Sequence, residues 1–370
     1  EPEKGDLMPG ALAGLTIVEM AGLGPGPFAA MMLADHGARV IRVERPGNLA
    51  VPNDPLTRNR ESIALDLRHE EGRAVVRRLA ASADGLIEGY RPGVMEKFGL
   101  GPEALLEANP KLIYGRVTGW GQEGPLAQAA GHDINYLALT GLLSCIGEKD
   151  RPAVPPLNLV ADYGGGGLML AFGMVAALLH AQRTGEGQVV DAAMTDGAAL
   201  TGALIYGLRA ACLWRDARGS NLLDGGDAVY GCYACADGKE VAVGAIEPQF
   251  RAALFAGLGL GPNPSKAEVA AAFAARPRDE WIALFEGKDA CVAPVLSLGE
   301  APEHPHNQAR GSFVALDGVV QPAPAPRLST TPAPLPRPPG GEGREGRAIL
   351  AEFGFDEAAI EELNAKGVLR

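Results

Sequence analysis

The chain has 370 residues, of which 47% are hydrophobic and 21% are charged, and it contains 50 glycines and 29 prolines. This composition excludes a disordered chain, a fibre and a coiled coil, and a chain of this length suggests roughly two domains. The formal net charge of −12 argues against general binding to nucleic acid or to an anionic membrane, because those partners need an overall or clustered positive field.

Membrane insertion and disulfide bonds are not expected. No stretch approaches the roughly 18 apolar residues that a membrane-spanning helix needs, so we expect a cytoplasmic protein. The five cysteines are odd in number and scattered, which is typical of a reducing compartment. Cys232 and Cys235 form the one Cys-x-x-Cys pair, but in a predicted strand such residues point to opposite faces. We therefore predict no metal site.

The first half of the chain alternates predicted strands and helices, which indicates an α/β fold with a largely parallel sheet and helices on both faces. Strands are predicted over residues 15–20, 39–43, 85–88, 112–118 and 188–194, and helices over 28–36, 72–82, 102–109 and 168–182. The last of these helices is mostly apolar, so we expect it to be buried on nearly all sides.

A second, smaller α+β domain is predicted at 225–300, where a hairpin with an Asp237-Gly238 turn precedes three helical patterns. Its strands are predicted at 229–236 and 240–244, and its helices at 248–258, 266–275 and 278–286. The large domain is expected over 1–190, with linkers at 191–224 and 301–330. Eight prolines between Gln321 and Pro339 indicate an extended connector, and a final helix is predicted at 346–363.

The turn after the first strand resembles a dinucleotide site. Residues 24–29 satisfy the pattern Gly-x-Gly-x-x-Ala, and Glu44 follows 20 residues after Gly24. Pro25 and Pro27, however, remove N–H groups from the loop that should hold a pyrophosphate, which weighs against NAD. The alternative is a tight turn in which Pro27 starts the helix.

Arginines gather near the ends of the early elements of this acidic chain: Arg39, Arg42, Arg45, Arg58, Arg60 and Arg68. One interpretation is scattered, solvated charge. The other is a site for a phosphorylated ligand, because a guanidinium group binds two phosphate oxygens at once.

Several segments, which follow in order through nearly the whole chain, resemble the α-methylacyl-CoA racemases of the family III CoA-transferase superfamily. They are residues 12–20, 24–28, 33–46, 58–60, 64–67, 88–94, 118–122, 131–136, 155–162, 187–194 and 244–250. The resemblance implies a large Rossmann-like domain completed by residues 331–370, a small α/β domain and two linkers. It also implies an interlocked homodimer, whose active site lies between the large domain of one subunit and the small domain of the other.

Racemisation requires a proton to leave one face of the α-carbon of an acyl thioester and another proton to arrive on the opposite face. By resemblance, the two acid/base groups are His132 and Asp162. Glu247 would accept a hydrogen bond from His132 and favour its charged form, and Tyr230 would support Asp162. The alternatives are a histidine satisfied by backbone at His132 and a helix N-cap at Asp162.

CoA is part of the substrate, so no separate cofactor is expected. The resemblance implies contacts with CoA from Arg45, Arg60, Leu65, Arg68, Tyr90, Arg91 and Gly131. The predicted function is therefore inversion of the α-carbon of 2-methyl-branched acyl-CoA thioesters, in fatty acid and lipid metabolism. The closest alternative is a family III CoA-transferase with Asp162 as nucleophile. A non-catalytic acyl-CoA-binding protein and a nicotinamide dehydrogenase fit the residues less well.

Overall fold

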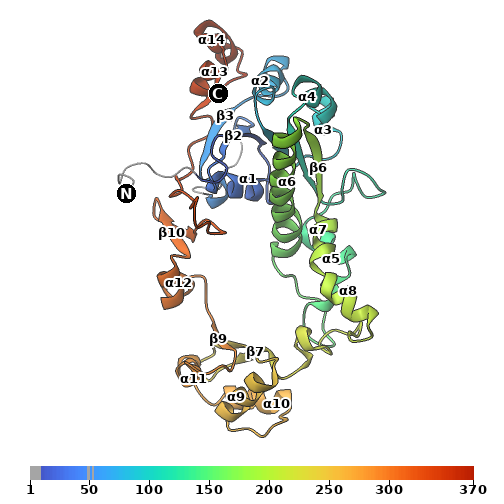
Figure 1. The fold of residues 1–370 in the computed structure, drawn as a ribbon, viewed down its shortest axis with the longest axis vertical. Coiled ribbons are helices and arrows are strands. Elements are labelled where there is room, and N and C mark those ends of the chain that lie inside the picture. Colours follow the sequence, from blue (N-terminus) through green and yellow to red (C-terminus); the bar gives the residue numbers. More distant parts are fainter. Residues whose placement is uncertain (1–9, 48–50, 52–53) are drawn as a thin grey trace. The chain divides into compact units, whose positions relative to one another are not determined.

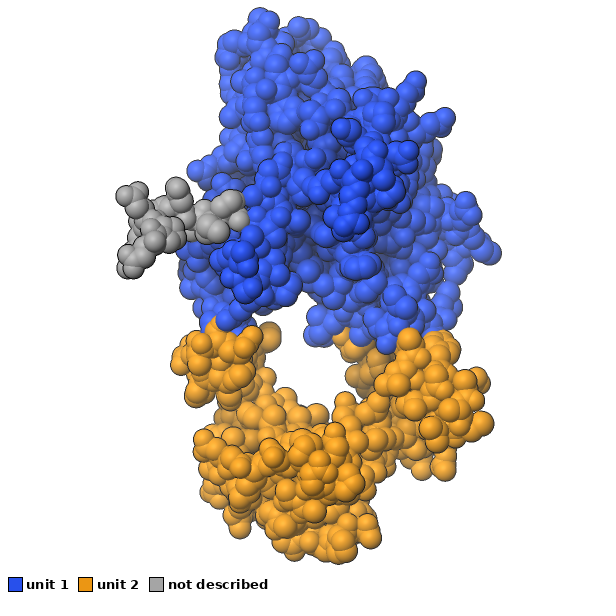
Figure 2. Space-filling view, viewed as in Figure 1, with its two compact units in different colours: residues 1–140, 157–201, 311–370 blue, residues 141–156, 202–310 orange. Residues whose placement is uncertain are grey.

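A computed structural model describes residues 10–47, 51 and 54–370 of the chain (Figure 1). The chain divides into two compact units, which Figure 2 colours separately. Unit 1 comprises the chain up to Thr140, Leu157–Thr201 and Gly311–Arg370, and unit 2 comprises Gly141–Pro156 and Gly202–Arg310. These bounds differ from those of the predicted domains, since Gly141–Pro156 precedes residue 190 and yet belongs to unit 2.

Unit 1 is built on a six-stranded sheet with the order β3-β2-β1-β4-β5-β6, in which all neighbouring strands are parallel. The strands are β1 (Thr16–Met20), β2 (Arg39–Glu44), β3 (Arg60–Ala64), β4 (Gly85–Glu88), β5 (Ile113–Thr118) and β6 (Gln188–Ala193). The order reverses between β1 and β4, and sheets of this kind bind ligands beyond the carboxyl ends of their strands at that reversal. The predicted Rossmann-like α/β fold is confirmed.

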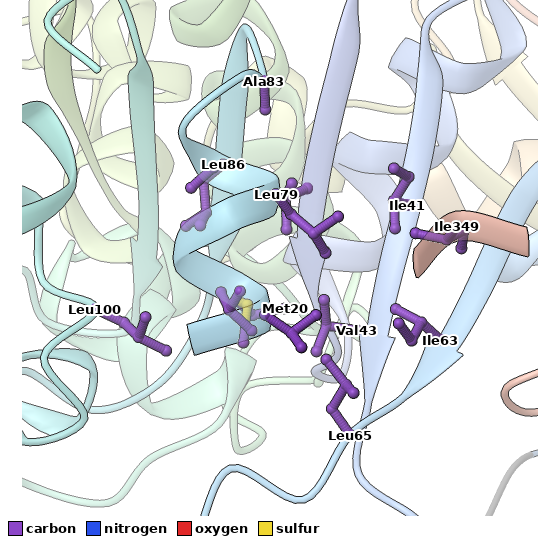
Figure 3. Close-up of a cluster of buried hydrophobic side chains, with 14 of the residues drawn as sticks. Met20, Ile41, Val43, Ile63, Leu65, Leu79, Ala83, Leu86, Leu100 and Ile349 are labelled. Carbon is purple, nitrogen blue, oxygen red and sulfur yellow. The ribbon is translucent and has the colours of Figure 1, made fainter. Parts of the chain in front are cut away.

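Helices cover the sheet because its strands are apolar on both faces. They include α1 (Pro25–Asp35), α2 (Glu70–Ala80), α3 (Val94–Lys97), α4 (Pro102–Ala108), α6 (Leu168–Thr184), α13 (Gly346–Glu352) and α14 (Glu357–Ala365). Figure 3 shows the core on one face, where Ile349 of α13 lies beside Ile41 and Ile63 of the sheet. Leu65 also pairs with Leu369 in an isolated bridge, so the C-terminal segment packs at the β3 edge of unit 1.

Helix α6 continues a π-helix, η3 (Leu159–Gly167). Together they form one helical stretch that is long and apolar enough, in length and composition, to cross a membrane, so the prediction that no such stretch exists is wrong. α6 packs against α1, β5 and β6 of unit 1. Its burial was also overestimated, because one face carries the exposed side chains Leu168, Phe172, Val175 and Leu179.

Unit 2 contains an antiparallel sheet with the order β7-β8-β9. Its strands are β7 (Tyr230–Ala234), β8 (Glu240–Gly244) and β9 (Val292–Val295), and its helices α9 (Pro248–Leu258), α10 (Lys266–Phe273) and α11 (Arg278–Phe285) share its core. The predicted α+β character is therefore confirmed. Cys232 is exposed and Cys235 is buried, as strand alternation predicts. Among the residues that the structure describes, no three His, Cys, Asp or Glu side chains could together hold a metal ion.

The remaining elements are short. Unit 2 also contains α8 (Ala203–Ala210) and α12 (Pro305–Arg310), and unit 1 contains the antiparallel hairpin of β10 (Phe313–Leu316) and β11 (Val319–Pro322). This hairpin falls within the predicted linker at 301–330. The predicted final helix is divided into α13 and α14, because Gly354 adopts a φ of 84° between them.

Candidate active site

His132 and Asp162 belong to two helices of unit 1 that pack against each other, α5 (Asp133–Leu139) and η3. His132 is exposed and occupies the N-cap position of α5, and its backbone N–H donates to Oδ1 of Asn135 at 3.1 Å. A buried histidine satisfied by backbone therefore does not describe it.

Asp162 lies inside the first turn of η3, and Asn158 occupies the N-cap position of that helix. The N-cap alternative for Asp162 is therefore wrong. Burial raises the pKa of the Asp162 carboxyl, while a hydrogen bond from Nδ2 of Asn158 at 3.4 Å and the nearby charge of His132 act in the opposite direction. A carboxyl with a raised pKa holds a proton more readily, which suits a group that must both accept and deliver one.

The glycines that follow Asp162 allow two backbones to approach closely. A Cβ atom on Gly165 would lie 2.5 Å from the backbone nitrogen of Ala198 in α7 (Met194–Thr201). A Cβ on Gly197 of α7 would lie 1.9 Å from the carbonyl oxygen of Gly165. The glycine run thus packs η3 against α7 and holds the helix that carries Asp162.

A cavity of about 290 Å³ opens beside His132 at the carboxyl ends of β4 and β5. Its lining includes Tyr90, Arg91, Gly131, Trp120 and Tyr136. Gly131 is required here, because a Cβ at this position would lie 2.7 Å from the ring of Tyr136 and 3.0 Å from that of Trp120. These two rings meet edge to face with centroids 4.8 Å apart. Burial, followed by the charge of Asp162, raises the pKa of the Tyr136 phenol, so this ring links the cavity to Asp162.

A second cavity, of about 370 Å³, lies beyond the carboxyl ends of β1, β2 and β3, and its lining includes Arg42 and Arg60. Leu23 and the loop around it line both cavities, and the Leu23 side chain is 92% exposed. A Cβ on the adjacent Gly24 would lie 3.4 Å from Oδ2 of Asp162. The loop therefore separates the arginine-lined cavity from His132 and Asp162.

Arg60, which we expected to contact phosphate, is buried in the wall of this second cavity. Its Nε donates to Oε2 of the fully buried Glu19 at 2.7 Å, and its other nitrogens donate to carbonyls of Pro27, Leu56 and Arg58. Glu19 also pairs with Arg42. These arginines therefore neutralise a buried carboxylate and fix the ends of the strands.

The other expected CoA contacts differ in accessibility. Leu65 is buried, and its N–H donates to the carbonyl of Glu44. Arg68 is exposed but pairs with Asp66, whose pKa it holds low. Arg45 is exposed and makes no hydrogen bond or ion pair with any residue that the structure describes. Arg91 is also exposed, whereas Tyr90 is half-buried and its hydroxyl donates to the carbonyl of Ala21 at 3.2 Å.

Glu247 and Tyr230 belong to unit 2. Tyr230 begins β7 and pairs with Gly244 at the end of β8, and the exposed Glu247 follows three residues later as the N-cap residue of α9. Unit 2 thus places both residues at the same end of its β7–β8 hairpin, as unit 1 places His132 near Asp162.

The dinucleotide interpretation finds no support in the geometry. Oε1 of Glu44 accepts a hydrogen bond from Nε of Arg42 at 2.9 Å, and Oε2 accepts one from Oγ of Ser62 at 2.6 Å. The carboxylate that would bind a ribose is therefore already occupied. α1 begins at Pro25, so the loop lacks the N–H donors of both Pro25 and Pro27.

Sequence reasoning missed Asp133, Tyr136 and Asn158. Asn158 precedes Asp162 by four residues and Tyr136 follows His132 by four, which is the spacing of neighbours on a helix surface. Had these two segments been identified as helices, that spacing would have indicated both residues. No local pattern would have indicated the contacts of Asp133, because they cross from one helix to another.

The sequence matches CoA-transferase family III over residues 12–344. The chain belongs to this family. It is 47% identical to human alpha-methylacyl-CoA racemase and 46% identical to the mouse protein of that name, in each case over 97% of both chains. The resemblance to these racemases is confirmed, and the prediction of a racemase-type enzyme agrees with their names. A CaiB/BaiF family protein from Brucella suis has a similar structure, with a TM-score of 0.81 and 29% identity, covering 93% of this chain and all of that one.

Proposed function

We propose that this protein inverts the α-carbon of 2-methyl-branched acyl-CoA thioesters by proton transfer between two bases, His132 and Asp162. The observation that carries the proposal is the placement of these two side chains. His132 lies beside a cavity at the carboxyl ends of the sheet strands, and Asp162 lies beside the loop that lines this cavity. The identity of 46–47% with the two racemases supports the same chemistry.

In one direction, His132 removes the α-proton and an enolate-like intermediate forms, with its negative charge on the thioester oxygen. Protonated Asp162 then delivers a proton to the opposite face. In the other direction, ionised Asp162 removes the proton and charged His132 delivers one. The pKa of Asp162, raised by burial, brings its protonated form nearer to neutral pH, as both directions require.

The substrate would bind across the loop around Leu23. The arginine-lined cavity beyond β1–β3 would accept the nucleotide end of CoA, and the exposed Arg45, which follows Glu44 in that cavity's wall, would bind a phosphate. The pantetheine arm would pass the exposed Leu23 toward His132, with Tyr90, Arg91 and Gly131 at the walls of the inner cavity. Arg60 and Leu65 would stabilise the strands that border the cavity and would not contact CoA directly.

The active form would be a homodimer. α1, α6 and α7 line an apolar cavity of about 660 Å³ in unit 1, with Phe172 of α6 73% exposed and Leu200 of α7 63% exposed. An apolar surface of this extent favours burial against another chain. Glu247 and Tyr230 would complete the site in that assembly, with Glu247 orienting the imidazole of His132.

The test is incubation of a single enantiomer of a 2-methylacyl-CoA in deuterated water, without an acceptor acid or a redox cofactor. We expect deuterium at the α-carbon and formation of the other enantiomer. The CoA-transferase alternative predicts no exchange, and transfer of CoA to an added carboxylic acid through a covalent intermediate on Asp162. Transfer without exchange would contradict the proposal.

A further inference from the structure

Asp133 joins the two helices of the site. It is the first residue of α5, directly after His132, and it is only 4% exposed. Its Oδ2 accepts hydrogen bonds from the backbone N–H groups of Ala161 at 2.8 Å and of Asp162 at 2.7 Å. One carboxylate oxygen next to His132 therefore holds the backbone of Asp162.

The start of η3 needs such an acceptor. The first N–H groups of a helix have no partner within it, and the side chain at the N-cap usually satisfies one of them. The N-cap residue of η3, Asn158, makes no capping hydrogen bond, since its side chain donates to the Asp162 carboxylate instead. Asp133 supplies the missing cap from a different helix.

The other oxygen of Asp133 is buried and has no hydrogen-bond partner among the residues that the structure describes. The carboxylate that holds the backbone N–H of Asp162 is therefore only half-satisfied in the described part of the chain. Leaving a buried carboxylate half-satisfied costs stability, so a purely structural cap would be served as well by a neutral side chain.

We propose that Asp133 is a positioning residue of the proton-transfer site: it fixes the separation of His132 and Asp162, and it places a carboxylate beside the backbone of Asp162. This inference rests on the proposed function.

The charges that act on Asp162 come from α5 and its N-cap. Asp133 raises the pKa of Asp162 and His132 lowers it, after the larger effects of burial and of Asn158. The phenol of Tyr136 in α5 also interacts with the Asp162 charge, and the other elements that pack against η3 carry further ionisable groups. They are Asp35 of α1, Arg116 of β5, His180 and Arg183 of α6, Asp191 of β6 and Asp196 of α7. Removal of the Asp133 charge should therefore lower the pKa of Asp162.

Two variants separate position from charge. Asp133→Ala removes the acceptor, and a displacement of about 1 Å at a reacting group lowers kcat by about 100-fold. KM should change little, because Asp133 contacts protein and not substrate. The loss of α-proton exchange with solvent should be larger for the enantiomer that Asp162 deprotonates, as in Asp162→Asn. Asp133→Asn keeps an acceptor oxygen, so most of kcat should remain, while the limb of the pH profile that reports Asp162 moves to lower pH.

Asp84→Ala is the matched control. Oδ2 of Asp84 also accepts a backbone N–H, from Thr16 at 2.8 Å, but at the amino end of β1 and away from both cavities. We expect this variant to lose stability and to keep kcat for both enantiomers.

The outcomes separate the two proposals. If the unaltered protein exchanges no α-proton, the proposed function fails. If it exchanges the proton, and Asp133→Ala keeps kcat or loses α-proton exchange equally for both enantiomers, the positioning role alone is wrong. Should Asp133→Ala not fold, the pH profile of Asp133→Asn decides: a shift to lower pH supports the role of the charge, and an unchanged profile overturns it.

Discussion

Replacing Gly197 by alanine tests whether the close contact between α7 and η3 positions Asp162. The new Cβ would lie 1.9 Å from the carbonyl oxygen of Gly165 and 2.8 Å from its Cα atom, whereas Cβ contacts under 3.0 Å are essentially never found. Both opposing atoms belong to the backbone, so no side-chain rotation relieves the clash. The two helices must therefore separate by about 1 Å, in an interior that is otherwise close-packed.

The magnitude follows from two opposing effects. Overpacking of a core costs up to about 3 kcal/mol, and alanine is better than glycine in a helix by about 1 kcal/mol. We expect a net loss of about 2 kcal/mol in the free energy of unfolding. A shift of about 1 Å in the helix that carries Asp162 should also lower kcat by about 100-fold, with KM little changed. Thermal unfolding and steady-state racemisation of both enantiomers measure these two effects.

Gly207→Ala is the control for this substitution. Gly207 lies in α8, and no heavy atom falls within 4 Å of a Cβ built there. This variant should gain about 1 kcal/mol of stability from helix propensity alone. A Gly197→Ala variant with unchanged stability and kcat would refute the argument that this glycine contact holds the acid/base residue.

Three further substitutions test the binding site, the buried ion pairs and the assembly. Arg45→Ala should raise KM for the CoA thioester far more than it lowers kcat, because it removes a contact made equally in the ground and transition states; steady-state kinetics with an unchanged KM and a collapsed kcat would contradict this. Glu19→Ala leaves Arg42 and Arg60 buried without their shared carboxylate, so the free energy of unfolding, measured with denaturant, should fall by about 3–5 kcal/mol. A loss too small to measure would refute the structural role of Glu19. Phe172→Asp places a charge on the exposed apolar face of α6 and should lower the thermal unfolding temperature of the homodimer, whereas an unchanged unfolding temperature would show that this face is not an interface.

Local patterns in the sequence located much of the fold. Periodicity and turn residues gave β4, β8 and α9 the same bounds as in the structure, at 85–88, 240–244 and 248–258. β3 was missed because its first residues, Arg60, Glu61 and Ser62, are polar. Their partners include Glu19 of β1 and Arg39 and Glu44 of β2. A strand whose polar residues depend on tertiary partners does not follow from alternation of apolar residues.

The end of the chain carried local signals that were not used. Gly354 and Asp356 separate α13 from α14, and the Asp356 side chain accepts the N–H of Ala359 at 2.8 Å as an N-cap. Glycine followed by a capping aspartate is a known boundary between helices, so a prediction of two helices was possible. The exposed face of α6 could not be anticipated, since apolar composition alone does not say which chain will cover it.

His132 and Asp162 were identified by resemblance to the racemases, because 30 residues separate them and no local spacing connects them. The structure adds the reason that they lie close together, which is the packing of α5 and α7 on η3. Whether Arg60 contacts CoA could not be judged from sequence, because only the structure shows that its N–H groups donate to Glu19 and to three backbone carbonyls. The same residue type is thus engaged in buried ion pairs and hydrogen bonds at Arg60 and is exposed at Arg45.

The two-base mechanism is tested most directly by deuterium wash-in with each enantiomer of a 2-methylacyl-CoA, using His132→Ala and Asp162→Asn. Each variant should lose reversible racemisation, because one face of the α-carbon then lacks its acid/base group. Each should still exchange the α-proton of the one enantiomer whose base remains, so the two variants should show opposite preferences. Identical preferences in both variants, or a covalent acyl adduct trapped on Asp162 of the unaltered protein, would contradict the mechanism.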